Sequence, residues 1–305
     1  MQIPSELARS LVGHWCHAGE KWLEALPGVI AEAEVRWGIS IGVPFEPGGF
    51  TSFVAPASTS GGTEVVYKCT VPHEEAADEP AALAAYGSFG AVQLLASEPA
   101  TFELLVERCT PGMSLWSVRD DAERGAIATD LMRRLWLAGD SSAVGPFEPV
   151  MAQWADLTER RLATSELPWV AGPIERGIDL LRTLPSSATN QVLLHGDFHP
   201  GNILAAEREP WLAIDPKPMG GDPAYEPIQL LTQRGGRVVE PPTQATIRRR
   251  LDLLGKDLDL DPDRIRQWGL ARSAEWSMWS FENGAIVDAA IQYSWARALD
   301  RLAPN

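Results

Sequence analysis

Cysteines and long apolar runs are both scarce in this chain of 305 residues. The three cysteines, Cys16, Cys69 and Cys109, are odd in number and widely spaced, which excludes a disulfide framework and a cysteine-rich metal site. We expect them to be small buried hydrophobic residues. No apolar run approaches the roughly 18 residues that a membrane span needs, and residues 6–26 predict an amphipathic helix with charges throughout. We therefore expect a cytoplasmic protein without a membrane partner.

Positive charge is scarce as well. The formal net charge is −15 at pH 7, the isoelectric point lies near 4.8, and only four of the 26 basic residues are lysines. This balance disfavours nucleic acid and produces a field that attracts cations, although an acidic composition also serves solubility alone. We therefore predict no nucleic-acid partner, and the charge favours a cationic small molecule as ligand.

The rest of the composition is that of an ordinary globular protein. Hydrophobic residues make up 45% of the chain and charged residues 22%, which excludes disordered and fibrous classes. A length of 305 residues suits one unit built from roughly two domain-sized parts.

The most informative motif is HGDFHPGNIL at residues 195–204. It follows a short apolar run, and its glycines and proline predict a loop that leaves a buried strand. Phosphoryl transfer needs a carboxylate that orients the attacking hydroxyl and two oxygen ligands that hold Mg²⁺ against the nucleotide phosphates. Asp197, Asn202 and, after a second apolar segment, Asp215 are the residue types for these tasks. We predict Asp197 as the catalytic residue and the other two as metal ligands.

The spacing of the two metal candidates predicts how they meet. Residues 203–206 and 211–214 read as two strands joined by a turn at 207–210, which predicts an antiparallel hairpin. Asn202 and Asp215 are symmetric about this turn. We expect them to face each other across strands about 4.8 Å apart, close enough to share one metal ion with bonds of about 2.1 Å. Singly, each residue could be an ordinary turn residue, so the joint pattern carries the prediction.

HGDFHPGNIL, followed by AIDPKP at 213–218 and GDPAYE at 221–226, resembles the aminoglycoside phosphotransferase family of kinase-like enzymes. The streptomycin 6-kinase and hydroxyurea phosphotransferase branch is the most similar part of that family, and the likeness extends over about residues 36–302. Gly196 stands where protein kinases have an arginine, and Pro216-Lys217 stands where they have Phe-Gly. These departures indicate a small-molecule acceptor and not a polypeptide.

The resemblance implies an α+β, protein-kinase-like bilobal fold with ATP in the cleft between the lobes. The expected N-lobe, residues 1–109, has a leading helix and an antiparallel sheet and binds the nucleotide. The expected C-lobe, residues 110–305, is mainly helical and carries the catalytic loop and the acceptor site.

A lysine for the nucleotide phosphates is the next expected part. Residues 63–71 alternate as a strand does and contain Lys68, for which an exposed strand lysine is the alternative interpretation. A carboxylate on the following helix should orient this lysine. Glu74, Glu75 and Glu79 are all candidates, and Glu79 occupies the position that resembles the glutamate of the family.

Two further segments are predicted to meet the nucleotide. Strands at 37–45 and 52–57 enclose EPGGFT, where Gly48 and Gly49 would let backbone amides approach the phosphates. The segment lacks the G-x-G-x-x-G pattern, and a plain turn is an equally good interpretation.

Strands at 92–96 and 101–108 lead to a crossing point between the lobes. The resemblance implies that backbone groups from Glu107 to Cys109 meet the adenine.

The acceptor site is predicted from the helical C-terminal part, residues 261–302. Glu275, Trp279 and Glu282 fall on one stripe of a helix, which suits a polycationic sugar through charge-assisted hydrogen bonds and stacking. The alternative is that the tryptophan belongs to the core and the glutamates are solvated. We add His199 as a candidate acceptor contact and interpret His195 as a brace for the loop, bonded to nearby backbone.

Together these patterns predict a phosphotransferase dependent on ATP and Mg²⁺, a monomer or homodimer, that moves the γ-phosphate to a hydroxyl of a small molecule. The resemblance favours a streptomycin-type aminoglycoside antibiotic or hydroxyurea as acceptor, so the activity would give resistance. A metabolic kinase for an amino sugar or another small alcohol is the alternative. A nucleotide-binding module without catalysis is disfavoured, because all the chemical residues are present.

Overall fold

A computed structural model describes residues 2–46, 48–166 and 168–302, apart from the side chains of residues 12 and 14–16. The expectation for Cys16 therefore lies outside the described residues. Cys69 is buried and Cys109 is partly buried, and both thiols are free. No helix in the described part of the chain is long and apolar enough to cross a membrane.

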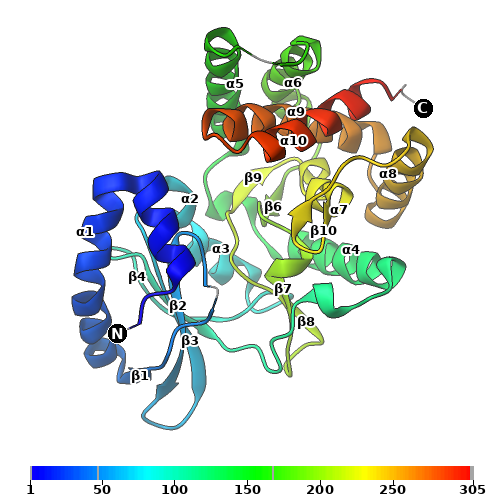
Figure 1. The fold of residues 1–305 in the computed structure, drawn as a ribbon. Helices are drawn as coiled ribbons and strands as arrows, with labels where there is room; N and C mark the ends of the chain where they lie inside the picture. Colours follow the sequence, from blue (N-terminus) through cyan, green and yellow to red (C-terminus); the bar gives the residue numbers. More distant parts are fainter. Residues whose placement is uncertain (1, 47, 167, 303–305) are drawn as a thin grey trace.

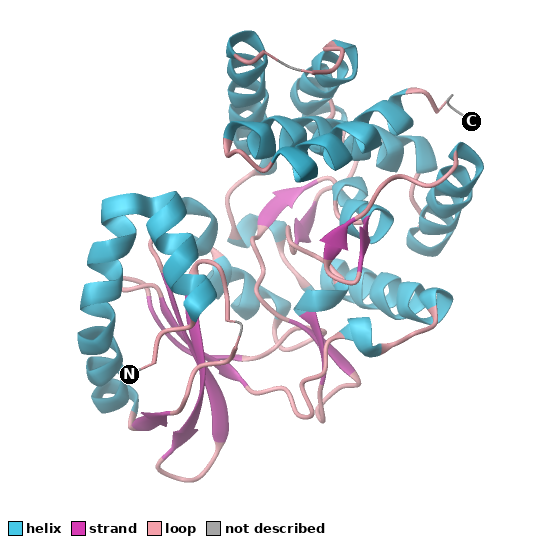
Figure 2. Cartoon of the chain, in the orientation of Figure 1, coloured by secondary structure: helices cyan, strands magenta, loops and turns pink. Residues whose placement is uncertain are grey.

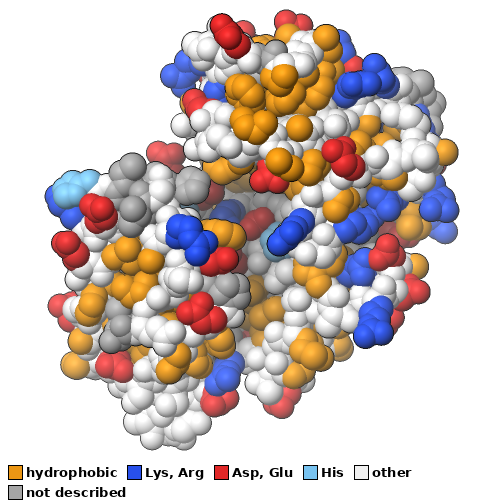
Figure 3. Space-filling model, in the orientation of Figure 1, with side chains coloured by type: hydrophobic (Ala, Val, Ile, Leu, Met, Phe, Trp, Pro, Cys, Tyr) orange, Lys and Arg blue, Asp and Glu red, His pale blue; other side chains and the backbone are white. Residues whose placement is uncertain are grey.

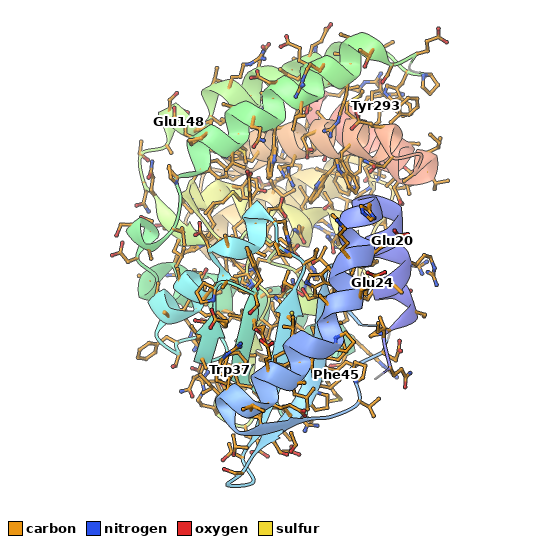
Figure 4. All side chains as sticks on the ribbon, turned by 90° about the vertical axis from the view of Figure 1, so that its left-hand side faces the viewer. Glu20, Glu24, Trp37, Phe45, Glu148 and Tyr293 are labelled. Carbon is orange, nitrogen blue, oxygen red and sulfur yellow. The ribbon has the colours of Figure 1, made fainter. Side chains whose placement is uncertain are left out.

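The first part of the chain is a helix packed on a sheet (Figure 1). Helix α1 (Ser5–Trp37) is followed by an antiparallel sheet with strand order β1-β2-β3-β5-β4. The strands are β1 (Ile39–Ile41), β2 (Ser52–Thr59), β3 (Glu64–Thr70), β4 (Leu94–Glu98) and β5 (Glu103–Glu107). Leu7, Leu11 and Leu26 of α1 join Phe53 and Tyr67 of the sheet in one buried core. Figure 4 shows α1 running across the sheet, with Trp37 at its last turn.

The strand predicted over residues 37–45 is wrong in its extent. Gly38 has φ +60°, the left-handed conformation that ends helices, and its N–H donates to Glu34 O. Helix α1 therefore includes Trp37, and only Ile39–Ile41 form the strand β1. The predictions for β2, β3 and β5 each agree with the structure to within two residues.

The second part is mainly helical (Figure 2). Its helices are α4 (Asp121–Ala138), α5 (Phe147–Thr164), α6 (Gly172–Thr183), α7 (Ile228–Thr232), α8 (Gln244–Leu258), α9 (Pro262–Glu282) and α10 (Ile286–Asp300). Helix α9 lies in the centre of this part, and its Trp268 is fully buried. Three short strand pairs complete it: β6 (Val192–Leu194) with β9 (Met219–Gly221), β7 (Ile203–Ala205) with β8 (Trp211–Ala213), and β10 (Gln233–Arg234) with β11 (Arg237–Val238).

The two parts are joined where the site forms. Helices α2 (Glu74–Ala77) and α3 (Glu79–Tyr86) follow β3, and Val92 N donates to Ala213 O of β8. The chain leaves the sheet after β5, and Gly112 N then donates to Ala205 O of β7. The space-filling view shows a hollow between the parts, in which acidic and basic side chains gather (Figure 3). The predicted α+β arrangement, with a β-rich first part and a helical second part, is confirmed.

Candidate active site

The candidate catalytic loop follows the buried strand β6, and hydrogen bonds to one glutamate hold its backbone. Glu226 accepts the backbone N–H groups of His195 and Gly196 at 2.7 and 2.9 Å, one on each carboxylate oxygen. The His195 ring is buried, and its Nε2 bonds the carbonyl of Ile214 at 3.0 Å. Burial lowers the pKa of His195 to about 4, so the ring is neutral near pH 7. The prediction that His195 braces the loop is confirmed.

Asp197 stands at the centre of a ring of donors. Gln229 Nε2 donates to its Oδ1 at 2.9 Å, while Lys217 Nζ at 3.0 Å and Asn202 Nδ2 at 3.2 Å reach its Oδ2. Burial alone would raise the pKa of Asp197, but attraction by Lys217 and the hydrogen bond from Gln229 outweigh it and lower that pKa. The group is therefore an ionised carboxylate in a fixed orientation, as a residue that receives a proton late in the reaction requires.

Lys68 of β3 links the two parts of the molecule. Its Nζ is 2.6 Å from both oxygens of Glu79 and 2.5 Å from Asp215 Oδ1. The side chain is buried, so the interpretation as an exposed strand lysine does not hold. Burial would lower the pKa of Lys68, but attraction by Asp215 and Glu79 raises it. Among the three candidate glutamates, Glu79 at the start of α3 is the one that the structure pairs with Lys68.

The hairpin that carries the metal candidates forms, but its predicted register is wrong by one residue. Ala205 pairs with Trp211, so the connection contains five residues and Asn202 lies opposite Ile214, whose N–H donates to Asn202 O at 2.9 Å. A slip of one residue turns a side chain to the other face of a strand pair. Asp215 therefore is not the cross-strand neighbour of Asn202. It follows the strand in a left-handed conformation with φ +59°.

The donor set fits a magnesium ion despite this difference. Asn202 donates its amide N–H groups to the backbone carbonyl and carboxylate of Asp197, which turns its amide oxygen away from that partner. Burial would raise the pKa of Asp215, but Lys68 and Lys217 lower it far below its ordinary value, so the carboxylate is ionised. Among the described residues no group of three or more His, Cys, Asp or Glu side chains is arranged to hold a metal. Magnesium typically takes one or two protein oxygens and completes its shell with phosphates and water.

Three residues of this site were missed by the sequence prediction. Glu226 and Gln229 had been given no role, and Lys217 had been noted only as a departure from protein kinases. Lys217 contacts Asp197 and lies 3.7 Å from Asp215 Oδ2, and it was visible in the DPK sequence as one of only four lysines. Glu226 ends the GDPAYE motif. Gln229 lies on α7 and has no local signal, because only the fold brings this helix to Asp197.

Of the remaining nucleotide candidates, Gly48 and Gly49 lie in the loop before β2, and Glu107 ends strand β5. Gly48 has φ +82°, and a Cβ there would come within 2.9 Å of Pro4, so both conformation and packing require glycine. Glu107 uses its carboxylate for Arg208, at 2.8 Å, and its backbone lies in β5. Contacts of Gly48, Gly49 and the 107–109 backbone with a nucleotide stay predictions.

The stripe predicted as the acceptor contact lies on α9, and its carboxylates are already paired. Glu275 is buried and accepts from Arg272 Nη1 at 2.7 Å, while Arg161 lies 2.7 Å from Glu282 and 3.8 Å from Glu275. Trp279 is 42% exposed. Burial raises the pKa of Glu275 although both arginines oppose the shift. Two negative charges thus face two positive charges, and the stripe carries little net attraction for a cation.

A small cavity opens beside the catalytic loop, on the side of α9. It is lined by Gly196, Tyr225, Glu226, Ile228, Gln229, Arg272 and Trp276. The Arg272 guanidinium lies 4.0 Å from the ring centroid of Trp154 and 4.3 Å from that of Trp276. Gln229 connects this cavity to Asp197, so the cavity adjoins the candidate catalytic carboxylate.

Comparisons with known proteins agree with this geometry. The chain is 35% identical over 311 residues to a hydroxyurea phosphotransferase of Kitasatospora aureofaciens, covering 94% of this chain and 82% of that protein. It is 32% identical over 298 residues to a streptomycin 6-kinase of Streptomyces glaucescens, covering 95% and 94% of the two chains.

Solved structures show the same fold at lower identity. The aminoglycoside phosphotransferase APH(4)-Ia superposes with a TM-score of 0.67 at 17% identity, over 92% of this chain and all of that chain. The choline kinase LicA of Streptococcus pneumoniae superposes with a TM-score of 0.64 at 14% identity, over 90% and 99%. The predicted kinase-like fold is confirmed. Residues 36–284 match the family described as aminoglycoside/hydroxyurea antibiotic resistance kinase, and the chain therefore belongs to that family of small-molecule phosphotransferases.

Proposed function

We propose that this protein transfers the γ-phosphate of ATP to a hydroxyl of a small acceptor, with Mg²⁺ as cofactor. The main support for this proposal is a continuous chain of contacts that runs from Glu79 through Lys68, Asp215 and Lys217 to Asp197. It joins the sheet to the catalytic loop and contains the groups that phosphoryl transfer requires. A complex of a structurally similar aminoglycoside phosphotransferase with AMP-PNP and hygromycin B supports ATP as donor.

The roles follow from position and charge. Lys68, oriented by Glu79, would bind the nucleotide phosphates, and Asn202 and Asp215 would supply oxygen ligands to Mg²⁺, which would neutralise phosphate charge. Asp197 aligns the acceptor hydroxyl with the γ-phosphorus. The acceptor O–P bond forms as the bond to the ADP oxygen breaks, and the hydroxyl proton passes to Asp197.

The acceptor that the site favours is a small neutral hydroxyl compound of the hydroxyurea type, with a streptomycin-type aminoglycoside second. Pairing of Glu275 and Glu282 with Arg161 and Arg272 favours this order, because a polycation would have to displace buried or bonded arginines. In the second case Trp279 and Glu282 of the α9 stripe, together with His199 beside Asp197, would be the acceptor contacts.

The test is a panel of acceptors with Mg·ATP. We expect hydroxyurea to gain one phosphoryl group in mass spectra, streptomycin to react more slowly, and a simple amino sugar to remain unmodified. The Asp197→Asn variant is the control for background hydrolysis. Equal turnover of the amino sugar would instead favour a metabolic kinase, and failure to bind ATP at all would overturn the proposed function.

A further inference from the structure

Lys217 lies between the two carboxylates on which the proposed reaction depends. Its Nζ is 3.0 Å from Asp197 Oδ2 and 3.7 Å from Asp215 Oδ2. Each carboxylate bonds a different partner through its other oxygen, Gln229 for Asp197 and Lys68 for Asp215. The ammonium group thus lies on the path from the proposed metal site to the proposed acceptor hydroxyl.

The backbone of Lys217 is locked to the catalytic loop. Its N–H donates to His195 O at 2.7 Å. Its carbonyl oxygen packs so closely on Gly196 that a Cβ added there would be 1.8 Å away, and Gly196 has φ +78°. The side chain is half-buried, with about a third of its surface exposed. The backbone of Lys217 is therefore fixed against the loop, while its side chain remains partly exposed.

Lys217 supplies Asp197 with a positive charge that the neighbouring side chains do not supply. His199 is 3.8 Å from Asp197, but its Nδ1 accepts the N–H of Gly201 at 3.0 Å, so the ring holds its single proton on Nε2 and is neutral. Lys68 is engaged with Glu79 on the nucleotide side. In the part of the chain that the structure describes, Lys217 is the one permanent positive charge paired with Asp197.

We propose that Lys217 is a further catalytic residue, which contacts the transferring phosphoryl group. This inference rests on the proposed function. A phosphoryl group in transit spreads negative charge over its three equatorial oxygens, and a positioned cation stabilises that charge more than it stabilises the ground state. The ammonium keeps its proton throughout. It exchanges part of its contact with Asp197 for a phosphoryl oxygen, which also leaves Asp197 Oδ2 available to accept the hydroxyl proton.

Nucleotide affinities distinguish a lysine that contacts the γ-phosphate from one that only balances the charge of the carboxylates. Dissociation constants of Mg·ADP and Mg·AMP-PNP are measured by calorimetry for the wild type, Lys217→Met and Lys217→Arg, with kcat measured in parallel. We expect Lys217→Met to leave ADP affinity within about threefold but to weaken AMP-PNP about tenfold, and to lower kcat on the order of 100-fold. Lys217→Arg should recover most of the AMP-PNP affinity.

Lys256→Met, on the exposed face of α8, is the matched control and should change neither ligand. Equal weakening of ADP and AMP-PNP, or unchanged binding of both with unchanged kcat, would overturn the proposal and leave Lys217 as a charge-balancing residue. A melting temperature for each apo variant guards against loss of folding. If the wild type bound neither nucleotide, the proposed function would fail first, which is a distinguishable result.

Discussion

Two groups of carboxylates in this protein are held by different cations, lysines at the cleft and arginines on α9. Asp197 and Asp215 bond Lys217 and Lys68, whereas Glu275 and Glu282 bond Arg272 and Arg161. Lysine is a compact charge on a flexible stem that can change partners, while the planar guanidinium bonds and stacks in one geometry. Arg272 also contacts the indole rings of Trp154 and Trp276, which fixes it further. The cleft pairs are thus suited to exchange with a ligand and the α9 pairs to holding the fold.

We expect the largest effect, a loss of kcat, from replacing a carboxylate of the cleft group. Asp197→Asn should lower kcat by about 10³-fold, because the carboxylate that orients the hydroxyl and accepts its proton is lost. Mg·ADP affinity should stay within about threefold, since the nucleotide side is unchanged. Steady-state kinetics with the best acceptor and calorimetry with ADP measure the two quantities. A fall in kcat of less than about tenfold would remove Asp197 from the chemistry.

The second largest effect is expected on the free energy of unfolding, when either of two glutamates of α9 is replaced. Glu275→Gln should lower the free energy of unfolding by about 3 kcal/mol, because it leaves the buried Arg272 without its charged partner. Glu282→Gln, on the exposed end of α9, should cost less than about 1 kcal/mol. Urea denaturation measures both. The acceptor KM of the double variant decides the stripe prediction, and an unchanged KM would count against acceptor contact there.

The smallest expected effect is a pH dependence from Glu226, which holds the catalytic loop by two backbone N–H groups. Burial raises its pKa to about 7 in the folded protein, against about 4.3 in the unfolded chain. The protonated form therefore favours folding, so its stabilisation is complete below about pH 4 and is lost as the pH rises through 7.

We expect the wild type to lose on the order of 2 kcal/mol relative to Glu226→Gln between pH 4 and pH 7. Denaturation midpoints of both proteins over this range give the difference. Parallel pH curves for the two proteins would show that Glu226 does not titrate there.

Sequence motifs located most of the site because its parts are local. The five-residue spacing of Asp197 and Asn202, the hairpin before Asp215 and the strand around Lys68 are all properties of short segments. The register of the hairpin was missed because one extra residue in the connection, Ala206, shifts every pair.

By itself, the sequence determined the fold class, the family and the strands around Lys68, since these follow from residue types at short spacing. Only the tertiary structure decided which glutamate meets Lys68, that Gln229 reaches Asp197, and that arginines neutralise the α9 carboxylates. Each of these contacts joins elements far apart in the chain, and their geometry depends on how two cores pack against each other. Periodicity and spacing describe one segment at a time, so they carry no information about such partners.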